Sequence, residues 1–295
     1  MDRRLHYWAV LVVAQTFALA AVAPAKQSPA GPAGTTADGG QKAEERPIQD
    51  NSFLVEEAYN QEYAVVQHIN GFQRVWPSGQ WAYSFTQEWP VDPAPRHQLS
   101  YTVPVVGAGG SLGTGIGDIA LNYRYQLIGS GEARVAFAPR FSLLLPTGDY
   151  RAGRGAGAVG CQGSLPLSIV LNKRIVTHWN LGTTIVPGQK NALGERSTTY
   201  GYNLGQSFVW LVHPRFNMLF ETVWVRAEAV VGAGRTAPSH SLFVSPGIRW
   251  AHNLPGGLQI VPGVAAPIGI GPSSGEKGIF LYLSIEHPFK KLKRD

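Results

Sequence analysis

Charged and amide side chains, separated by even numbers of residues, share one face of each of two neighbouring stretches of the chain. Asn122 and Arg124 alternate with apolar residues in the first stretch, and Arg134 and Arg140 do so in the second. Such groups on the wall of an aqueous passage can order water and select solutes by charge. They can equally form hydrogen-bonded ion pairs that plug a narrow interior. The full candidate set comprises Asp118, Asn122, Arg124, Arg134, Arg140, Glu221, Arg249 and Glu286.

The elements that must position these side chains are strands. Ile119, Leu121 and Tyr123 share one face of the first stretch, and the polar residues share the other, which is the period of two that predicts a β-strand. The turn at 129–132 predicts that the second stretch returns as a hairpin. A soluble sandwich would bury the apolar row, whereas a membrane barrel would turn it to lipid.

The rest of the chain repeats strand and turn, without an amphipathic helix. Alternate connections differ: Lys173-Arg174 and His213-Pro214 are tight, whereas "GQKNALGERST" (188–198) and "VGAGRTAPS" (231–239) are long and polar. Short turns at one end and long loops at the other are typical of outer-membrane barrels. The expected strands cover approximately residues 63–75, 80–90, 97–106, 116–128, 132–146, 157–172, 174–186, 200–212, 215–228, 239–252, 257–268 and 278–289.

The sequence therefore predicts an all-β fold, a transmembrane antiparallel up-and-down β-barrel of about twelve strands of the outer-membrane type. In this prediction the row with Leu121 and Tyr123 faces lipid, and Asn122 and Arg124 face a lumen. A soluble periplasmic β-sandwich is the alternative.

Four regions are expected along the chain. Residues 1–25 combine an Arg pair, a short apolar run and small-residue cleavage sites, as in a secretory signal peptide. Residues 26–50 are rich in Pro, Gly and Ala and lack aromatic residues, which predicts a disordered periplasmic leader. Residues 51–289 form the barrel, and 290–295 form a basic tail.

An acidic cluster precedes the first expected strand. Glu56, Glu57 and Glu62, with His68, could suggest a metal site, but they lack a spacing specific to metal ligands. We favour a short capped turn or helix that leads into the barrel, and we expect no metal and no cofactor.

Composition excludes several functional classes. The net charge of +6 is concentrated in the signal and the tail, and no nucleic-acid-binding motif accompanies it, so no nucleic-acid partner is expected. The single cysteine, Cys161, allows no intramolecular disulfide. His178 and other histidines occur without a nucleophile motif such as G-x-S-x-G, so we expect no enzymatic activity.

Several short segments resemble a known family, among them "NSFLVEEAYNQE", "YSFTQEWPV", "GIGDIALNYRYQL" and "FSLLLPTGD". The chain resembles, over residues 51–289, the outer-membrane barrels described as meta-pathway phenol-degradation proteins or putative transporters. The resemblance implies a channel-like protein, and some members are proposed to help take up aromatic compounds. One departure is that Phe289, at the position of the usual terminal aromatic assembly signal, is followed by "KKLKRD".

The expected function is porin-like, passive uptake of a small solute, with aromatic compounds as candidates, across the outer membrane of a Gram-negative bacterium. The expected partners are outer-membrane lipid, the solute and the barrel assembly machinery; the sequence does not determine an oligomeric state. A non-transporting structural or adhesion barrel is one alternative, and an outer-membrane hydrolase is another.

Overall fold

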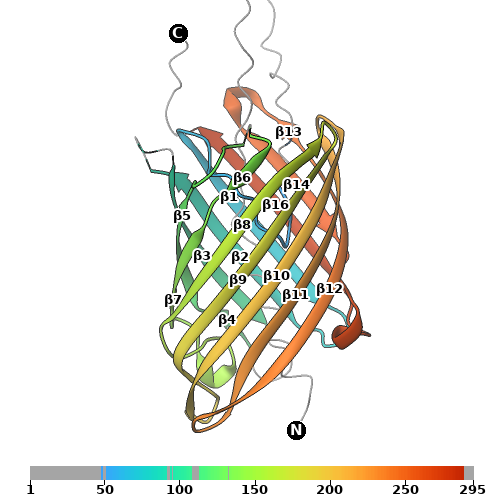
Figure 1. Ribbon diagram of the computed structural model, residues 1–295. Helices are drawn as coiled ribbons and strands as arrows, with labels where there is room; N and C mark the ends of the chain where they lie inside the picture. Colours follow the sequence, from blue (N-terminus) through green and yellow to red (C-terminus); the bar gives the residue numbers. More distant parts are fainter. Residues whose placement is uncertain are drawn as a thin grey trace, which may run out of the picture.

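The computed structural model describes residues 48, 51–91, 94, 96–107, 113–131 and 133–288. They form a closed antiparallel barrel of 12 strands in which neighbours along the chain are neighbours in space (Figure 1). The barrel closes where the first strand, β1 (Val65–Val75), pairs with the last, β16 (Gly278–Pro288). Closure removes the unpaired strand edges that a lipid environment would not tolerate.

Most strands of the barrel wall are continuous, and three are interrupted. The continuous strands are β2 (Trp81–Pro90), β3 (His97–Gly107), β8 (Gly160–Asn172), β9 (Ile175–Lys190), β10 (Arg196–His213), β11 (Phe216–Gly232) and β12 (Arg235–Trp250). The interrupted ones are β4 (Thr114–Ile116) with β5 (Ile119–Tyr125), β6 (Val135–Phe137) with β7 (Arg140–Leu145), and β14 (Gln259–Ala265) with the short β15 (Ile268–Gly269); the short β13 (His252–Asn253) continues β12 beyond Ala251 and pairs with β14.

Within the described residues, helical structure is limited to three short 3₁₀ turns, at Tyr150–Ala152, Pro255–Gly257 and Gly271–Ser273. No helix in the described residues has the length and apolar character needed to cross a membrane.

The polarity of the barrel is inverted relative to a water-soluble protein. Leu121 and Tyr123 are 46% and 40% exposed on the outer face. Arg124, which follows Tyr123 in the same strand but points to the opposite face, is 1% exposed in the interior. The same alternation runs along β10, where Tyr202 and Phe208 face outward and Asn203 is buried. The predicted fold is confirmed, as is the prediction of which side chains face outward and which face inward. The sandwich alternative is wrong.

Two regions expected as loops are instead parts of long hairpins. Backbone pairing continues to Arg196 opposite Lys190, and to Arg235 opposite Gly232, so β9 to β12 extend further than predicted at the lower end in Figure 1. Gly234, with a φ of 66°, permits the tight turn between β11 and β12. The polar composition of these stretches reflects exposure to solvent rather than loss of pairing.

Residues 51–62 depart most from expectation. They form neither a helix nor a strand, and Phe53, Glu56 and Tyr59 are at most 1% exposed inside the barrel. We call residues 51–62 the lumen segment. The expected helix is absent from these residues, because their backbone bonds to interior side chains instead of to itself. A turn at Tyr63 and Ala64, closed by the bond from the Val65 amide to the Glu62 carbonyl at 3.1 Å, does lead into β1. The predicted signal peptide, nearly all of the leader and the tail lie outside the described residues.

Both ends of the lumen segment lie at the same end of the barrel. Upstream, the Ile48 amide donates to the carbonyl of Pro214, in the tight turn between β10 and β11, at 2.6 Å. Downstream, β1 begins at Val65, which is paired with Pro288 at the end of β16. The lumen segment thus enters and leaves the interior at the end with the short turns.

We predict that Leu121→Arg destabilises the folded barrel in lipid vesicles by about 2 to 4 kcal/mol, because it places a cation on the lipid face midway along β5. The matched control is Leu193→Arg, at a hairpin tip where the side chain is already 85% exposed. Equilibrium unfolding in vesicles measures both. Equal stability of the two variants would contradict a lipid-facing outer surface.

Candidate functional site: the filled lumen

One carboxylate of the barrel wall holds the middle of the lumen segment. Oε1 of Glu221, on β11, accepts the backbone amides of Phe53 at 3.0 Å, Leu54 at 2.7 Å and Val55 at 3.0 Å. Glu221 is fully buried. Three donors without partners of their own would be costly in the interior, and charge-assisted bonds to one acceptor satisfy them.

Amide and hydroxyl side chains of other strands hold the rest of the backbone. Asn180, on β9, accepts from the Glu56 amide and donates to its carbonyl oxygen, both at 2.6 Å. Ser168, on β8, accepts from the Ala58 amide at 2.8 Å. Gln126 accepts from the Asn60 amide at 2.9 Å. The segment is thus bonded to several separate strands, and the inward amides of the wall take the role of a sheet partner.

The Glu56 side chain lies in a cage of basic and hydroxyl groups. Nε of Arg140 is 3.0 Å from both carboxylate oxygens, Arg124 makes a short ion pair through Nη2, and Oγ of Ser164 lies at 3.3 Å. Glu56 is completely buried, and each arginine is at most 3% exposed. We call Arg124, Arg140 and Ser164 the arginine cage.

Residues of the barrel wall orient Arg140 within the arginine cage. Arg140 donates through Nη1 to Oδ1 of Asn122 at 3.0 Å and to Ser142, and through Nη2 to Oε1 of Gln162 at 3.2 Å. Arg124, in contrast, donates to the Tyr59 carbonyl of the lumen segment at 2.6 Å. The position of Arg140 is therefore fixed by wall residues, independently of the lumen segment.

Glycines on the opposite wall make room for Phe53. This ring packs against Phe280 and Tyr282, with centroids 5.6 and 5.1 Å away. A Cβ atom on Gly263 would lie 2.5 Å from the Phe53 ring, and one on Gly247 would lie 2.8 Å from it. Side chains at these positions would occupy the space that the lumen segment fills.

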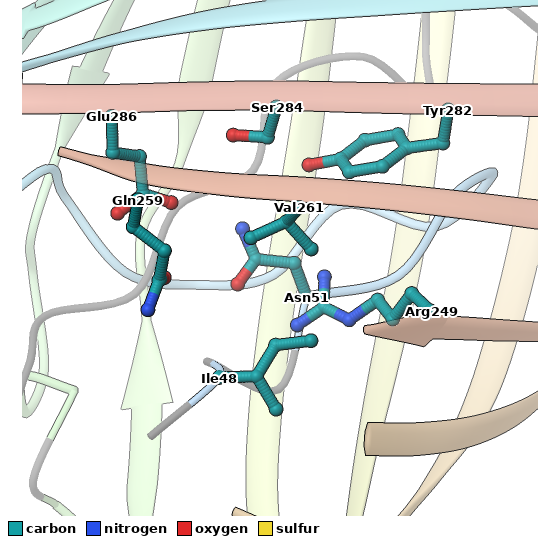
Figure 2. A pocket seen from close by; sticks show the side chains of 8 residues that line it. All are labelled: Ile48, Asn51, Arg249, Gln259, Val261, Tyr282, Ser284 and Glu286. Atoms are coloured by element: carbon teal, nitrogen blue, oxygen red, sulfur yellow. The ribbon is translucent and has the colours of Figure 1, made fainter. Parts of the chain in front are cut away.

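A small pocket lies between the lumen segment and the wall formed by β12, β14 and β16 (Figure 2). The space that it leaves is too narrow for a water molecule, whereas typical ligand pockets measure roughly 300 to 1,000 Å³. Its lining is mostly polar and comprises Ile48, Asn51, Arg249, Gln259, Val261, Tyr282, Ser284 and Glu286. The pocket is too tight to hold a solute, so the lumen is filled in this structure.

Most residues predicted to line the lumen do face the interior. Asn122, Arg124, Arg140 and Glu221 belong to the network around the lumen segment. Arg249 and Glu286 line the small pocket, where Glu286 also accepts from Gln67 at 3.0 Å. The remaining two predicted residues, Asp118 and Arg134, lie elsewhere.

Asp118 orders the connection between β7 and β8, because its carboxylate accepts the backbone amides of Gly148 at 2.9 Å and Ala156 at 2.7 Å. Arg134 has inward parity but lies before the first residue of β6, where its side chain is exposed to solvent. Its prediction as a lumen residue is wrong, because the alternation of side chains along a strand does not show where that strand begins or ends.

The sequence prediction missed the role of Glu56. The metal alternative would require Glu56, Glu57 and Glu62 near His68, but Glu56 points into the arginine cage and Nε2 of His68 lies 3.2 Å from that of His287. Across the described ranges, no group of three His, Cys, Asp or Glu side chains is arranged to hold a metal ion. One signal in the sequence could have indicated this role. Glu56 lies in an apolar segment, and the inward residues Arg124 and Arg140 have no acidic neighbour on their own strands.

A comparison of the sequence with protein-family models finds no match, and neither does a comparison with curated protein sequences. Solved structures do match. An outer membrane channel from Pseudomonas putida F1 aligns over 78% of this chain and 97% of its own, with a TM-score of 0.55 and 14% identity. The NanC porin aligns over 75% of this chain and 98% of its own, with a TM-score of 0.50 and 8% identity. These similarities show the outer-membrane barrel fold.

We predict that Gly263→Leu displaces Phe53 and loosens the lumen segment, because the new side chain takes the space of the ring. A glutamate-specific protease should then cut the folded protein in detergent at Glu56 or Glu57 several times faster than in the unaltered chain. The matched control is Gly163→Leu, where a Cβ meets nothing within 4 Å. Unchanged cleavage in a folded Gly263→Leu barrel would show that Phe53 does not anchor the segment.

Proposed function

We propose that this protein is an outer-membrane channel for the passive uptake of a small solute, and that the lumen segment is its gate. The observation that carries the proposal is a polar barrel interior closed by a segment that is not part of the wall. The segment is held by side-chain hydrogen bonds and ion pairs, and both of its ends lie at the end with the short turns. It can therefore withdraw toward that end while the wall stays closed.

The chemistry of the interior supports transport. A barrel that served only as a rigid support could fill its interior with wall side chains, as barrels of about eight strands do. This 12-stranded barrel instead presents hydroxyl, amide and charged groups inward, including Thr86, Thr102 and Gln162. Once the lumen segment leaves, these groups would line a hydrated passage. The channel and the porin with similar folds support the same proposal.

The solute class and the location rest on separate observations. The resemblance to the phenol-degradation family favours an aromatic compound as the solute. The apolar outer face and the barrel fold favour the outer membrane of a Gram-negative bacterium, with lipid and the barrel assembly machinery as partners. The proposal assigns the protein no catalytic role, no cofactor and no nucleic-acid partner.

A structural or adhesion barrel without transport is the second candidate. The specific observation in its favour is the extent of the filling, since Val55, Glu57 and Ala58 are completely buried and the neighbouring polar groups are bonded across the lumen. The two candidates differ in whether the lumen segment moves.

A disulfide lock tests this difference. Oγ of Ser52, in the lumen segment, donates to Oγ of Ser207, on β10, at 2.6 Å, so cysteines at both positions bring their sulfur atoms within bonding reach. In a Cys161→Ser background, we expect oxidised Ser52→Cys/Ser207→Cys protein to conduct less than the reduced form in planar bilayers. Reductant should restore the conductance to that of the unaltered protein. Proteoliposomes should likewise take up phenol more slowly with the oxidised variant than with the reduced variant.

The single variant Ser52→Cys in the same background controls for effects of the reductant. Equal, measurable conductance in the oxidised and reduced states would exclude the lumen segment as the gate. No conductance in either state, nor in Gly263→Leu, would favour the structural barrel.

A further inference from the structure

We infer that the arginine cage is a carboxylate-binding site of the barrel wall, that Glu56 is its resident occupant, and that solutes bearing a carboxylate compete with Glu56 for it. The inference rests on the proposed function, because it names a solute class and a means of opening for the same channel. The structure itself supplies the evidence for the ligand chemistry, since the occupant of the cage is a carboxylate.

The cage and its occupant come from different parts of the molecule. Arg124 lies on β5, Arg140 on β7 and Ser164 on β8, so the whole cage is wall, whereas Glu56 belongs to the lumen segment. The Arg140 guanidinium is held by Asn122 and Gln162, which are also wall residues. Departure of the lumen segment would thus leave Arg140 oriented for another carboxylate.

The charge balance favours replacement of Glu56 by an anion. Two guanidinium groups, which stay ionised at any physiological pH, share the Glu56 carboxylate. Glu88, on β2, also faces this region and its carboxylate accepts from Gln98 at 2.9 Å, but one further carboxylate cannot balance two guanidinium groups. Without Glu56 the cage would carry an excess of positive charge in a narrow interior where water screens weakly. A small carboxylate restores both the charge and the hydrogen bonds.

Competition converts binding into opening. A solute carboxylate binds the cage only when Glu56 has left, so its binding shifts the population toward the released lumen segment. The backbone bonds to Glu221 and Asn180 oppose release and keep the open probability low without solute. Small carboxylic acids, including aromatic acids, therefore open the channel that admits them, whereas neutral analogues do not.

The first experiment measures binding without transport. Glu56→Ala leaves the cage with a vacancy of carboxylate size, and acetate should fill it and raise the thermal unfolding midpoint of this variant by about 2 to 5 °C at saturation. Acetamide, of the same shape but neutral, should have no such effect. The unaltered protein, whose cage is occupied, and the double variant Glu56→Ala/Arg140→Gln should not respond to acetate beyond a common salt effect.

The second experiment measures opening in planar bilayers. Benzoate should raise the open probability of the unaltered channel several-fold, and benzamide at the same concentration should not. Glu56→Gln preserves the size of the side chain but removes its charge, so this variant should open more often without benzoate and respond less to it. It also serves as the test variant if Glu56→Ala does not fold.

The outcomes separate the two proposals. Absence of an acetate effect on folded Glu56→Ala, or equal responses of the unaltered channel to benzoate and benzamide, overturns the inference even when the channel conducts. A selective acetate effect together with a complete lack of conductance in every variant supports the carboxylate site and overturns the proposed channel function.

Discussion

Two guanidinium groups buried inside a barrel require a negative charge close to them, and the Glu56 carboxylate meets this requirement. Unpaired, each buried charge would be strongly destabilising, of the order of 3 to 5 kcal/mol when a partner is removed. The ion pairs of Glu56 with Arg124 and Arg140 therefore determine where the lumen segment sits. They bring the segment against β5, β7 and β8, and this placement allows its amides to reach Asn180 and Ser168.

The wall is adapted to this occupant in two further ways. Glu221 gathers three consecutive amides, which satisfies the backbone of a segment that has no strand partner. Gly263, on β14, leaves space for the Phe53 ring, which packs on Phe280 and Tyr282. Polar anchoring on one side and apolar packing on the other hold the segment in one position.

The same interactions would make closure by the proposed gate reversible. Hydrogen bonds and ion pairs of the lumen segment can be exchanged for bonds to water or to a solute, whereas the pairing between the wall strands is independent of them. Because Ile48 and Val65 lie at the same end of the barrel, residues 51–62 could move toward that end without crossing the wall. Closure and opening are thus separable from the stability of the wall.

The sequence alone determined the wall, and only the tertiary structure decided what fills it. Strict alternation at 119–125 was sufficient to place Leu121 outside and Arg124 inside, because the side chains of a strand alternate between its two faces. The alternation did not show that β6 begins only at Val135 and leaves Arg134 exposed at the end of the wall, since strand ends depend on pairing with other strands. The lumen segment has no period of its own, and its partners lie far away in sequence: Glu56 meets Arg140 across 84 positions. Those contacts exist only once the barrel closes, so no local pattern could reveal them.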